Sequence, residues 1–463
     1  MLALPSPPSR LSTTTSSIVE SGSTFQGRRV SIVRIHPVNA AGGESGEGAG
    51  ADPQSLAGAP LRDPQWYHRP GTLSLSAPPP LSVYVHLPWC LKKCPYCDFN
   101  SHEYTTAGAT PKDLPEARYL DALRADLERS LPIVWGRTIQ TIFIGGGTPS
   151  LFSPDGIARL LSDLRMLLPL AADCEITMEA NPGTFEKERF RAFAQAGVNR
   201  LSIGVQTFND AHLRALGRVH DGAQALAAAE EAARSFETFN LDLMYALPGQ
   251  TLADLDADLD QAFALGAPHL SLYHLTMEPN TVFAKRPPAN LPDDDTAYEM
   301  LDRVTERTGG AGFERYEVSA YARNGHRCRH NVNYWQFGDY LGLGAGAHGK
   351  LSFAHRVMRQ VRWREPGMYM DRSLAGQAVS NEDDVTRAQL PFEFMLNALR
   401  LREGFALTLF AERCGLPLSA IEKGLHEAET RGLIARTGLP GAEWVQPTVR
   451  GFDFLNDLQE LFL

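Results

Sequence analysis

Cys90, Cys94 and Cys97 form the clearest chemical pattern in this sequence, because three thiols stand within one short segment. Thiolates bind iron and zinc, so the segment predicts a metal site. A structural zinc site usually has four protein ligands, and His102 is the closest residue that could supply a fourth. Three thiolates on a [4Fe-4S] cluster instead leave one iron open to a small molecule. The spacing favours the [4Fe-4S] cluster, with a zinc site or simple packing as the alternatives.

The elements that must position these thiols form a repeating pattern of strand and helix. The apolar segment before Cys90 predicts a strand, and five similar segments follow it along the chain. The six predicted strands are 82–86, 139–144, 175–180, 200–205, 240–245 and 270–274. Amphipathic segments lie between them; in one, Ser153 predicts a helix cap and Pro154 the first helical position. Its apolar stripe consists of Ile157, Leu160, Leu161 and Leu164.

Strands that alternate with helices run parallel, and six units are too few to close an eight-stranded barrel. The sequence therefore predicts an α/β fold with an open, partial (β/α)6 barrel. The three thiols would leave the first strand at its carboxyl end, where enzymes with this architecture react.

Four regions are expected along the chain: a disordered, low-complexity tail (1–79), the barrel (80–310), a connecting region (311–385) and a C-terminal domain (386–463). Arginines among the hydroxyl residues of the tail leave a targeting segment open as an alternative. Helical patterns over 389–401, 407–414 and 418–431 precede a hairpin over 433–451 and a last helix. This order predicts a small α+β domain of winged-helix-like form. Because it has no aromatic-basic stripe, an architectural role is favoured over DNA binding.

The composition narrows the class of protein further. With 43% hydrophobic residues and no apolar run of about 20 residues, the chain is expected to be globular without a membrane-spanning helix. The net charge of -10 argues against nucleic acid as a partner. Only six cysteines occur, and three of them are scattered, which does not resemble a disulfide framework. A reducing compartment, the cytoplasm, is therefore expected.

Beyond the cysteines, nine short motifs recur in a recognisable order. They are 84–90, 97–100, 144–150, 179–183, 204–208, 216–220, 241–249, 330–335 and 344–349. Together they resemble the oxygen-independent coproporphyrinogen oxidase group of the radical SAM superfamily, and most closely its HemW-type heme chaperone branch. The resemblance extends from Leu81 to the C-terminus, and it implies both a [4Fe-4S] cluster and S-adenosylmethionine.

The resemblance also implies which residues contact S-adenosylmethionine. They are Tyr84, Tyr96, Gly146, Gly147, Thr148, Glu179, Gln206, Arg218 and Asp242. The residue types suit this role, because glycines let the backbone approach a ligand and polar residues that end strands point into the barrel mouth. Each of these residues, taken alone, is equally compatible with a turn, a cap or a surface position.

Two activities remain open at this point. In the oxidases that the chain resembles, a fourth cysteine stands two positions after the third, and Phe99 occupies that place here. The resemblance therefore favours a heme chaperone that transfers heme to acceptor hemoproteins, membrane respiratory proteins among them. Coproporphyrinogen III oxidation, a step of porphyrin biosynthesis, is the alternative, so whether the chain is an enzyme stays open. A homodimer is compatible with either activity.

His330 is the predicted heme ligand, because an imidazole can bind heme iron and aromatic residues follow it in the motif 330–335. A structural histidine is the alternative. Three nearby residues are rival ligands: His326, Cys328 and His348. His86, on the first strand, is expected to pack or hydrogen-bond within the barrel.

Overall fold

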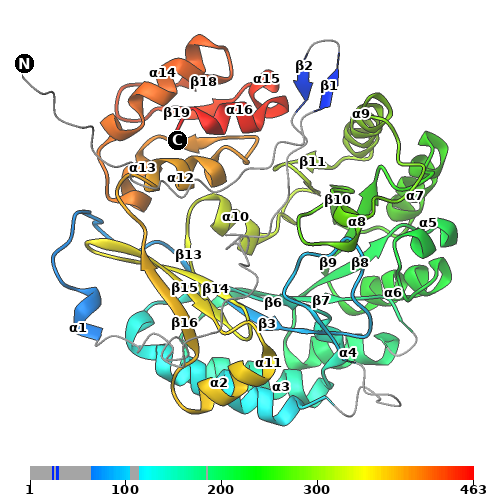
Figure 1. The fold of residues 1–463 in the computed structure, drawn as a ribbon, viewed down its shortest axis with the longest axis horizontal. Coiled ribbons are helices and arrows are strands. Elements are labelled where there is room, and N and C mark those ends of the chain that lie inside the picture. Colours follow the sequence, from blue (N-terminus) through cyan, green and yellow to red (C-terminus); the bar gives the residue numbers. More distant parts are fainter. Residues whose placement is uncertain (1–22, 26–27, 31–63, 105–113, 184–185) are drawn as a thin grey trace, which may run out of the picture.

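The computed structural model describes residues 23–25, 28–30, 64–104, 114–183 and 186–463. Its central feature is a curved mixed sheet of twelve strands, with helices packed along its outer side (Figure 1). The strand order is β11-β12-β10-β9-β8-β7-β6-β3-β13-β14-β15-β16. No helix in the described part of the chain is long and apolar enough to cross a bilayer.

All six predicted strands are present and lie next to one another in parallel. They are β3 (Leu81–Leu87), β6 (Ile139–Gly146), β7 (Leu170–Ala180), β8 (Arg200–Gln206), β9 (Thr238–Tyr245) and β10 (His269–His274). Their apolar side chains are almost completely buried, as expected for strands covered on both faces. The partial barrel and the α/β class are thus confirmed.

Helices follow each of the six parallel strands and cover the sheet. They are α2 (Glu116–Val134), α3 (Pro154–Leu167), α4 (Glu186–Ala196), α5 (Asp210–Ala215), α6 (Gly222–Ser235), α7 (Leu252–Ala264), α8 (Val282–Lys285) and α9 (Asp294–Gly310). Helix α3 begins as predicted: the Ser153 side chain accepts a hydrogen bond from the Gly156 N–H, and Pro154 occupies the first turn. Its predicted apolar stripe is buried.

The sheet continues beyond the six predicted strands on both sides. Strand β13 pairs in parallel with β3 and adds a seventh parallel strand. The further elements are β11 (Glu314–Arg315), β12 (Ala320–Ala322), α10 (Arg329–Trp335), β13 (Asp339–Leu343), β14 (His348–Phe353), β15 (Arg356–Arg362), α11 (Pro366–Leu374) and β16 (Val379–Asp384). The region expected only to connect two domains therefore builds both edges of the main sheet.

The C-terminal region forms a small module around a second core, to which Leu73, Leu75 and Val357 also contribute. Its elements are α12 (Leu390–Ala398), β17 (Phe405–Ala406), α13 (Thr408–Cys414), α14 (Glu422–Thr430), β18 (Ile434–Thr437), β19 (Trp444–Pro447), α15 (Val449–Asp453) and α16 (Leu455–Glu460). The predicted helices and hairpin are present, and β17 completes a small antiparallel sheet in the order β17-β19-β18. Helix α10 lies between this module and the barrel strands (Figure 1).

The prediction of a disordered tail up to residue 79 is wrong for its last part. Residues 64–79 include α1 (Pro64–Tyr67), and Tyr67, Leu73 and Leu75 are buried in the two main cores. The Tyr67 hydroxyl also donates to Glu382 Oε2 at 2.7 Å. A few apolar residues in a polar stretch were enough to join existing cores. Apart from the strand pair β1 (Ser23–Phe25) and β2 (Arg28–Val30), the earlier tail lies outside the described residues.

Candidate functional site

The three predicted cluster cysteines lie in the loop that follows β3. The loop leaves the barrel through β4 (Trp89–Cys90) and returns in β5 (His102–Glu103), which pairs with it in parallel. Inside the loop, the Cys97 N–H donates to the Cys94 carbonyl at 3.1 Å, and the Tyr104 N–H donates to the Cys90 carbonyl at 2.9 Å. The backbone thus folds the loop so that all three thiols face the barrel interior.

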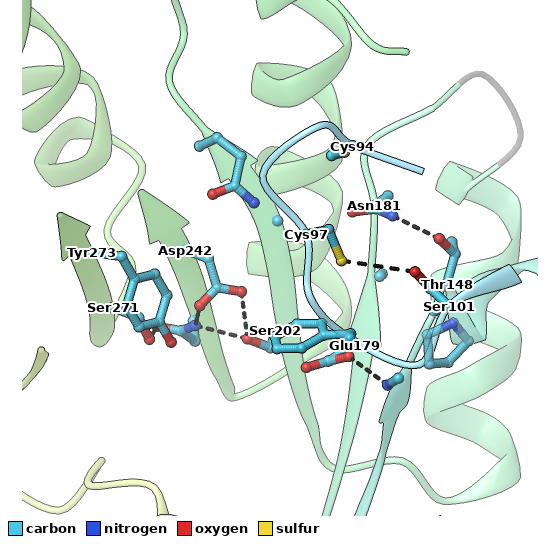
Figure 2. Close-up of a pocket in the computed structure, with 18 of the residues that line it drawn as sticks. Cys94, Cys97, Ser101, Thr148, Glu179, Asn181, Ser202, Asp242, Ser271 and Tyr273 are labelled. Carbon is cyan, nitrogen blue, oxygen red and sulfur yellow. Dashed lines mark hydrogen bonds between the residues drawn. The ribbon is translucent and has the colours of Figure 1, made fainter. Parts of the chain in front are cut away.

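A cavity of about 560 Å³ runs through the barrel beside this loop, and its walls include all three thiols. It reaches from the carboxyl ends of the strands, at Gly146 and Gln206, to their amino-terminal parts, at Arg200 and His269. Figure 2 shows the end near the cysteines, where the polar side chains point into the same space.

Eight of the nine residues expected to contact S-adenosylmethionine line this cavity. They are Tyr96, Gly146, Gly147, Thr148, Glu179, Gln206, Arg218 and Asp242. Tyr84 does not line it; its hydroxyl lies 2.7 Å from His86 Nδ1, and its ring packs beside Phe143. His86 also contacts the Asn100 carbonyl, which agrees with the internal role expected for it.

The sulfur atoms have only weak partners within the protein. Thr148 Oγ1 lies 3.5 Å from Cys90 Sγ, and Arg218 Nη1 lies 3.5 Å from Cys94 Sγ. Burial raises the pKa of the Cys90 thiol and raises that of Cys97 to about 11. A metal that binds these sulfurs must therefore displace protons, and it replaces poor hydrogen bonds with strong bonds. The set of residues fits an iron-sulfur cluster held by three thiolates.

The glycine loop after β6 lies directly against the cysteine loop. The Gly147 N–H donates to the Leu87 carbonyl at 2.8 Å, and the Thr148 N–H donates to the Trp89 carbonyl at 2.7 Å. A Cβ atom at position 147 would come within 2.5 Å of the Trp89 carbonyl oxygen. Gly147 is therefore required by this contact between two backbones.

Glu179, the last residue but one of β7, lines the cavity and has few partners for its negative charge. Its Oε2 accepts one hydrogen bond, from the Gly146 N–H at 3.0 Å (Figure 2). Burial, together with the neighbouring Asp242 carboxylate, raises the pKa of Glu179 to about 7. Such a carboxylate gains most from a ligand that brings a positive charge or hydrogen-bond donors.

Asp242 is held by polar side chains that were not among the predicted site residues. Ser202 Oγ donates to Asp242 Oδ2 at 3.0 Å, and Asn240 Nδ2 donates to Asp242 Oδ1 at 2.8 Å. Burial raises the pKa of Asp242 in spite of these bonds. Ser202 lies four residues before Gln206, and Asn240 lies two residues before Asp242. In a strand this spacing places both side chains on one face, so it could have identified Ser202 and Asn240 from the sequence.

Arg218 and Asn181 connect the two halves of this end of the cavity. Arg218 Nη2 donates to Asn181 Oδ1 at 2.6 Å and to the Gly204 carbonyl at 2.8 Å, while Asn181 Nδ2 donates to Thr148 Oγ1 at 2.8 Å. Asn181 belongs to the motif 179–183 but was not among the predicted site residues. These bonds fix Arg218 beside Cys94.

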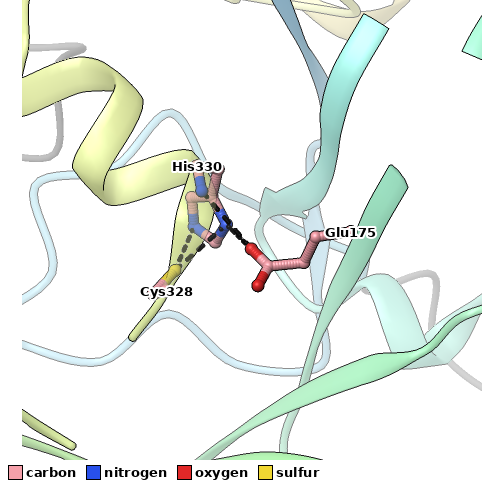
Figure 3. A group of neighbouring side chains, drawn as sticks. All are labelled: Glu175, Cys328 and His330. Carbon is pink, nitrogen blue, oxygen red and sulfur yellow. Dashed lines mark hydrogen bonds and ion pairs between the residues drawn. The ribbon is translucent and has the colours of Figure 1, made fainter. Parts of the chain in front are cut away.

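His330 lies on α10 at the other end of the cavity. Its ring stacks on Phe143, with centroids 4.2 Å apart. Its Nδ1 lies 3.1 Å from Cys328 Sγ and 3.4 Å from Glu175 Oε1 (Figure 3). Of the rival ligands, Cys328 also lines the cavity, whereas His326 and His348 do not. Glu175 was not predicted as a site residue, because nothing in a strand sequence shows which charge is buried.

Two buried donors near His330 have no hydrogen-bond acceptor among the described residues. They are Arg200 Nη2 and Trp335 Nε1, and both residues line the cavity. An unsatisfied buried donor costs about 1–3 kcal/mol, so this end of the cavity favours a ligand with acceptor oxygens.

A chain of hydrogen bonds joins the two ends of the cavity. His269 Nδ1 lies 2.7 Å from Asn240 Oδ1, and His269 Nε2 lies 2.9 Å from the Tyr316 hydroxyl. The Cys328 N–H donates to the same hydroxyl at 3.2 Å. Because Asn240 also binds Asp242, the two ends are in continuous contact through neutral polar groups.

Comparisons with known proteins agree with this arrangement. The Radical SAM superfamily pattern matches residues 84–262, and the HemN C-terminal domain pattern matches residues 385–439. Heme chaperone HemW from Escherichia coli (strain K12) is 46% identical over 387 residues, which cover 83% of this chain and 98% of that protein. Heme chaperone HemW from Bacillus subtilis (strain 168) is 34% identical over 373 residues, 77% of this chain and 96% of that protein.

A solved structure has the same overall architecture. Coproporphyrinogen III oxidase (HemN) from Escherichia coli, a radical SAM enzyme, superposes with a TM-score of 0.70 at 24% identity. The match covers 83% of this chain and 90% of that chain. At this identity, the likeness establishes the fold.

Proposed function

This chain belongs to the HemW family of heme chaperones in the radical SAM superfamily, and we propose that it binds heme and transfers it to acceptor hemoproteins. The superfamily implies a [4Fe-4S] cluster and S-adenosylmethionine. The observation that supports the proposal best is the single cavity lined both by the three thiols and by the motif residues around His330.

In this proposal, the cluster binds Cys90, Cys94 and Cys97. S-adenosylmethionine binds beside it, against the glycine loop and the polar strand ends described above. The carboxylate of Glu179, whose pKa burial raises to about 7, suits the positively charged amino group of the cofactor. When bound, the cluster and cofactor can supply one-electron chemistry at this end of the cavity.

Heme occupies the part of the cavity next to α10, with His330 as the axial ligand. The unpaired donors of Arg200 and Trp335 are suitable partners for the two propionate groups of heme, because carboxylates accept hydrogen bonds from such donors. Tyr334 and Trp335 also line the cavity and offer apolar surface to the macrocycle. To reach the iron, His330 must exchange its contacts with Cys328 and Glu175 for the new bond.

The acceptors are hemoproteins, and membrane respiratory proteins are one class of them. We place the protein in the cytoplasm, where reduced thiols are maintained, and a homodimer is one arrangement in which it could work. Nucleic acid is not expected as a partner, since the net charge is -10.

An anaerobic comparison of two ligands tests the function. Cluster-loaded protein is given heme in one sample, and coproporphyrinogen III with S-adenosylmethionine and a reductant in another. The proposal expects about one bound heme per chain with a shifted Soret band, and no protoporphyrinogen. Transfer is then measured as loss of that heme to an apo-hemoprotein. Turnover of coproporphyrinogen without stable heme binding would instead support the oxidase.

A further inference from the structure

We propose that Glu175, Cys328 and His330 form a second metal site, separate from the cluster cysteines, for one divalent transition-metal ion such as Zn²⁺. The three side chains come from two distant parts of the chain, β7 and the start of α10. Each offers one donor atom, and the three donor atoms all lie within 4.8 Å of one another (Figure 3). A thiol, an imidazole and a carboxylate are the usual zinc donors.

The distances between the donors are close to those of a metal site. Cys328 Sγ lies 3.1 Å from His330 Nδ1, and Glu175 Oε1 lies 3.4 Å from the same nitrogen. In a tetrahedral site with bonds of about 2.0–2.3 Å, neighbouring ligand atoms are separated by roughly 3.3–3.6 Å. Cys328 Sγ is also 3.3 Å from His330 Nε2, so the sulfur lies beside the ring, and a shared ion requires the Cys328 side chain to rotate toward the Nδ1 lone pair.

Hydrogen bonds and a stacking contact hold the three donor residues in place, and those of Glu175 are made by Oε1 itself. Glu175 Oε1 accepts hydrogen bonds from the backbone N–H groups of Arg329, at 3.0 Å, and His330, at 3.3 Å. The Cys328 N–H donates to the Tyr316 hydroxyl, and the His330 ring stacks on Phe143. Such outer contacts orient ligands in metal sites and reduce the entropy lost on binding.

A bare ion can use all three donors, whereas heme iron can use only His330, so zinc and heme would compete for this residue. In heme, four of the six iron positions are taken by the macrocycle, and the remaining two lie on opposite faces. Three donors gathered on one side can therefore give heme iron only one ligand. A bare ion can bind all three and keep its fourth position open toward the cavity, which Cys328 and His330 line. Three protein ligands with one open position are typical of catalytic zinc sites.

Zinc retention by cluster-loaded, heme-free protein tests the site, because the cluster then occupies the other three cysteines. After incubation with Zn²⁺ and desalting, we expect about one zinc per chain, with X-ray absorption showing one sulfur and otherwise light ligands. Cys328→Ser and Glu175→Gln should each lower zinc affinity at least tenfold while cluster iron is unchanged. Cys174→Ser is the matched control, since Cys174 precedes Glu175 but packs in the hydrophobic core, and it should retain zinc.

Three results would overturn the proposal: no zinc retained by the unmodified protein, equal retention in Cys328→Ser, or a zinc signal with several sulfur ligands. If Cys328→Ser also loses its cluster, Glu175→Gln decides the question, because it leaves every thiol in place. Heme binding is measured separately on zinc-free protein. A failure of heme binding therefore does not change the interpretation of the zinc measurement.

Discussion

Two buried glutamates on the same strand, Glu175 and Glu179, have opposite electrostatic environments. Burial raises the pKa of Glu179 to about 7, with a further contribution from Asp242, and the Gly146 N–H donates a hydrogen bond to its carboxylate (Figure 2). Burial also acts on Glu175, but the hydrogen bond from His330 and the charge of Arg200 outweigh it and lower its pKa. Four residues of strand, about 13 Å along the backbone, separate the two residues.

This difference shows how the two ends of the cavity are built. The end with Glu179 and the thiols contains charges that only a ligand can satisfy, as expected for a site that receives a cluster and a cationic cofactor. At the other end, Glu175 and His330 already contact each other, while Arg200 Nη2 and Trp335 Nε1 remain unpaired donors. A ligand there must compete with protein groups, which suits reversible binding of a cargo.

The largest effect is expected at the end that depends on ligands. Replacing Cys90, Cys94 or Cys97 by Ala should abolish the [4Fe-4S] cluster, because two thiolates leave two irons without protein ligands. Iron and sulfide analysis, with the visible absorption of the cluster, measures the loss. Cys414→Ala, in the C-terminal core, should keep the cluster. A cluster that survives in all three variants would contradict the assignment.

A truncation tests whether both ends depend on the same scaffold. Removal of residues 1–79 deletes Tyr67, Leu73 and Leu75 from the two cores, and burial of such side chains contributes about 1.5–3 kcal/mol each. We expect a large drop in the midpoint of thermal unfolding, with both cluster and heme binding weakened. Removal of residues 1–63 alone is the control and should be tolerated. Equal stability of the two truncated proteins would show that residues 64–79 add nothing to the fold.

The fold was largely predictable, because strand and helix alternation is visible in the apolar pattern itself. Strand β13 was missed, since Asp339 and Gly342 interrupt its apolar run and a glycine-rich loop follows it. Residues 64–79 were missed for a different reason. Their composition shows that they are polar, but only the structure shows that Leu73 and Leu75 pack into the core of the C-terminal module.

The site was predictable where residues end predicted strands or follow a fixed spacing. Glu175 and Tyr316 could not be found this way, because their roles depend on tertiary contacts with Cys328 and His330. For Tyr84, the resemblance implies a cofactor contact that stays a prediction, and the structure adds a contact of its hydroxyl with His86 Nδ1 at 2.7 Å.

The pH dependence of stability should separate the two glutamates. The raised pKa of Glu179 means that its ionisation opposes folding, so stability is lost as pH rises from about 4.5 to about 7, by about 3 kcal/mol in total. Glu179→Gln removes this loss and should be more stable than the unmodified protein above about pH 7. Thermal unfolding of cofactor-free protein over this range measures the difference.

Glu175→Gln should behave in the opposite way in the same experiment. Since the pKa of Glu175 is lowered, its carboxylate stabilises the fold above its ordinary pKa, and the variant should lose stability at neutral pH. A variant pair with the same sign of change would remove the distinction between the two ends of the cavity.

The smallest effect, and the most selective, is expected for His330→Ala. On the chaperone proposal, this change removes the axial ligand of heme, so heme affinity should fall about tenfold or more, about 1.4 kcal/mol, and the Soret band should change. Cluster content and S-adenosylmethionine affinity should persist, because the thiols and Glu179 lie at the other end of the cavity. His348→Ala is the matched control, since His348 does not line the cavity.

Unchanged heme affinity in His330→Ala would make Cys328 the next candidate ligand, because it is the rival that also lines the cavity. Loss of cluster and heme together would instead mean that α10 supports the whole barrel, and that the two ends of the cavity are not independent.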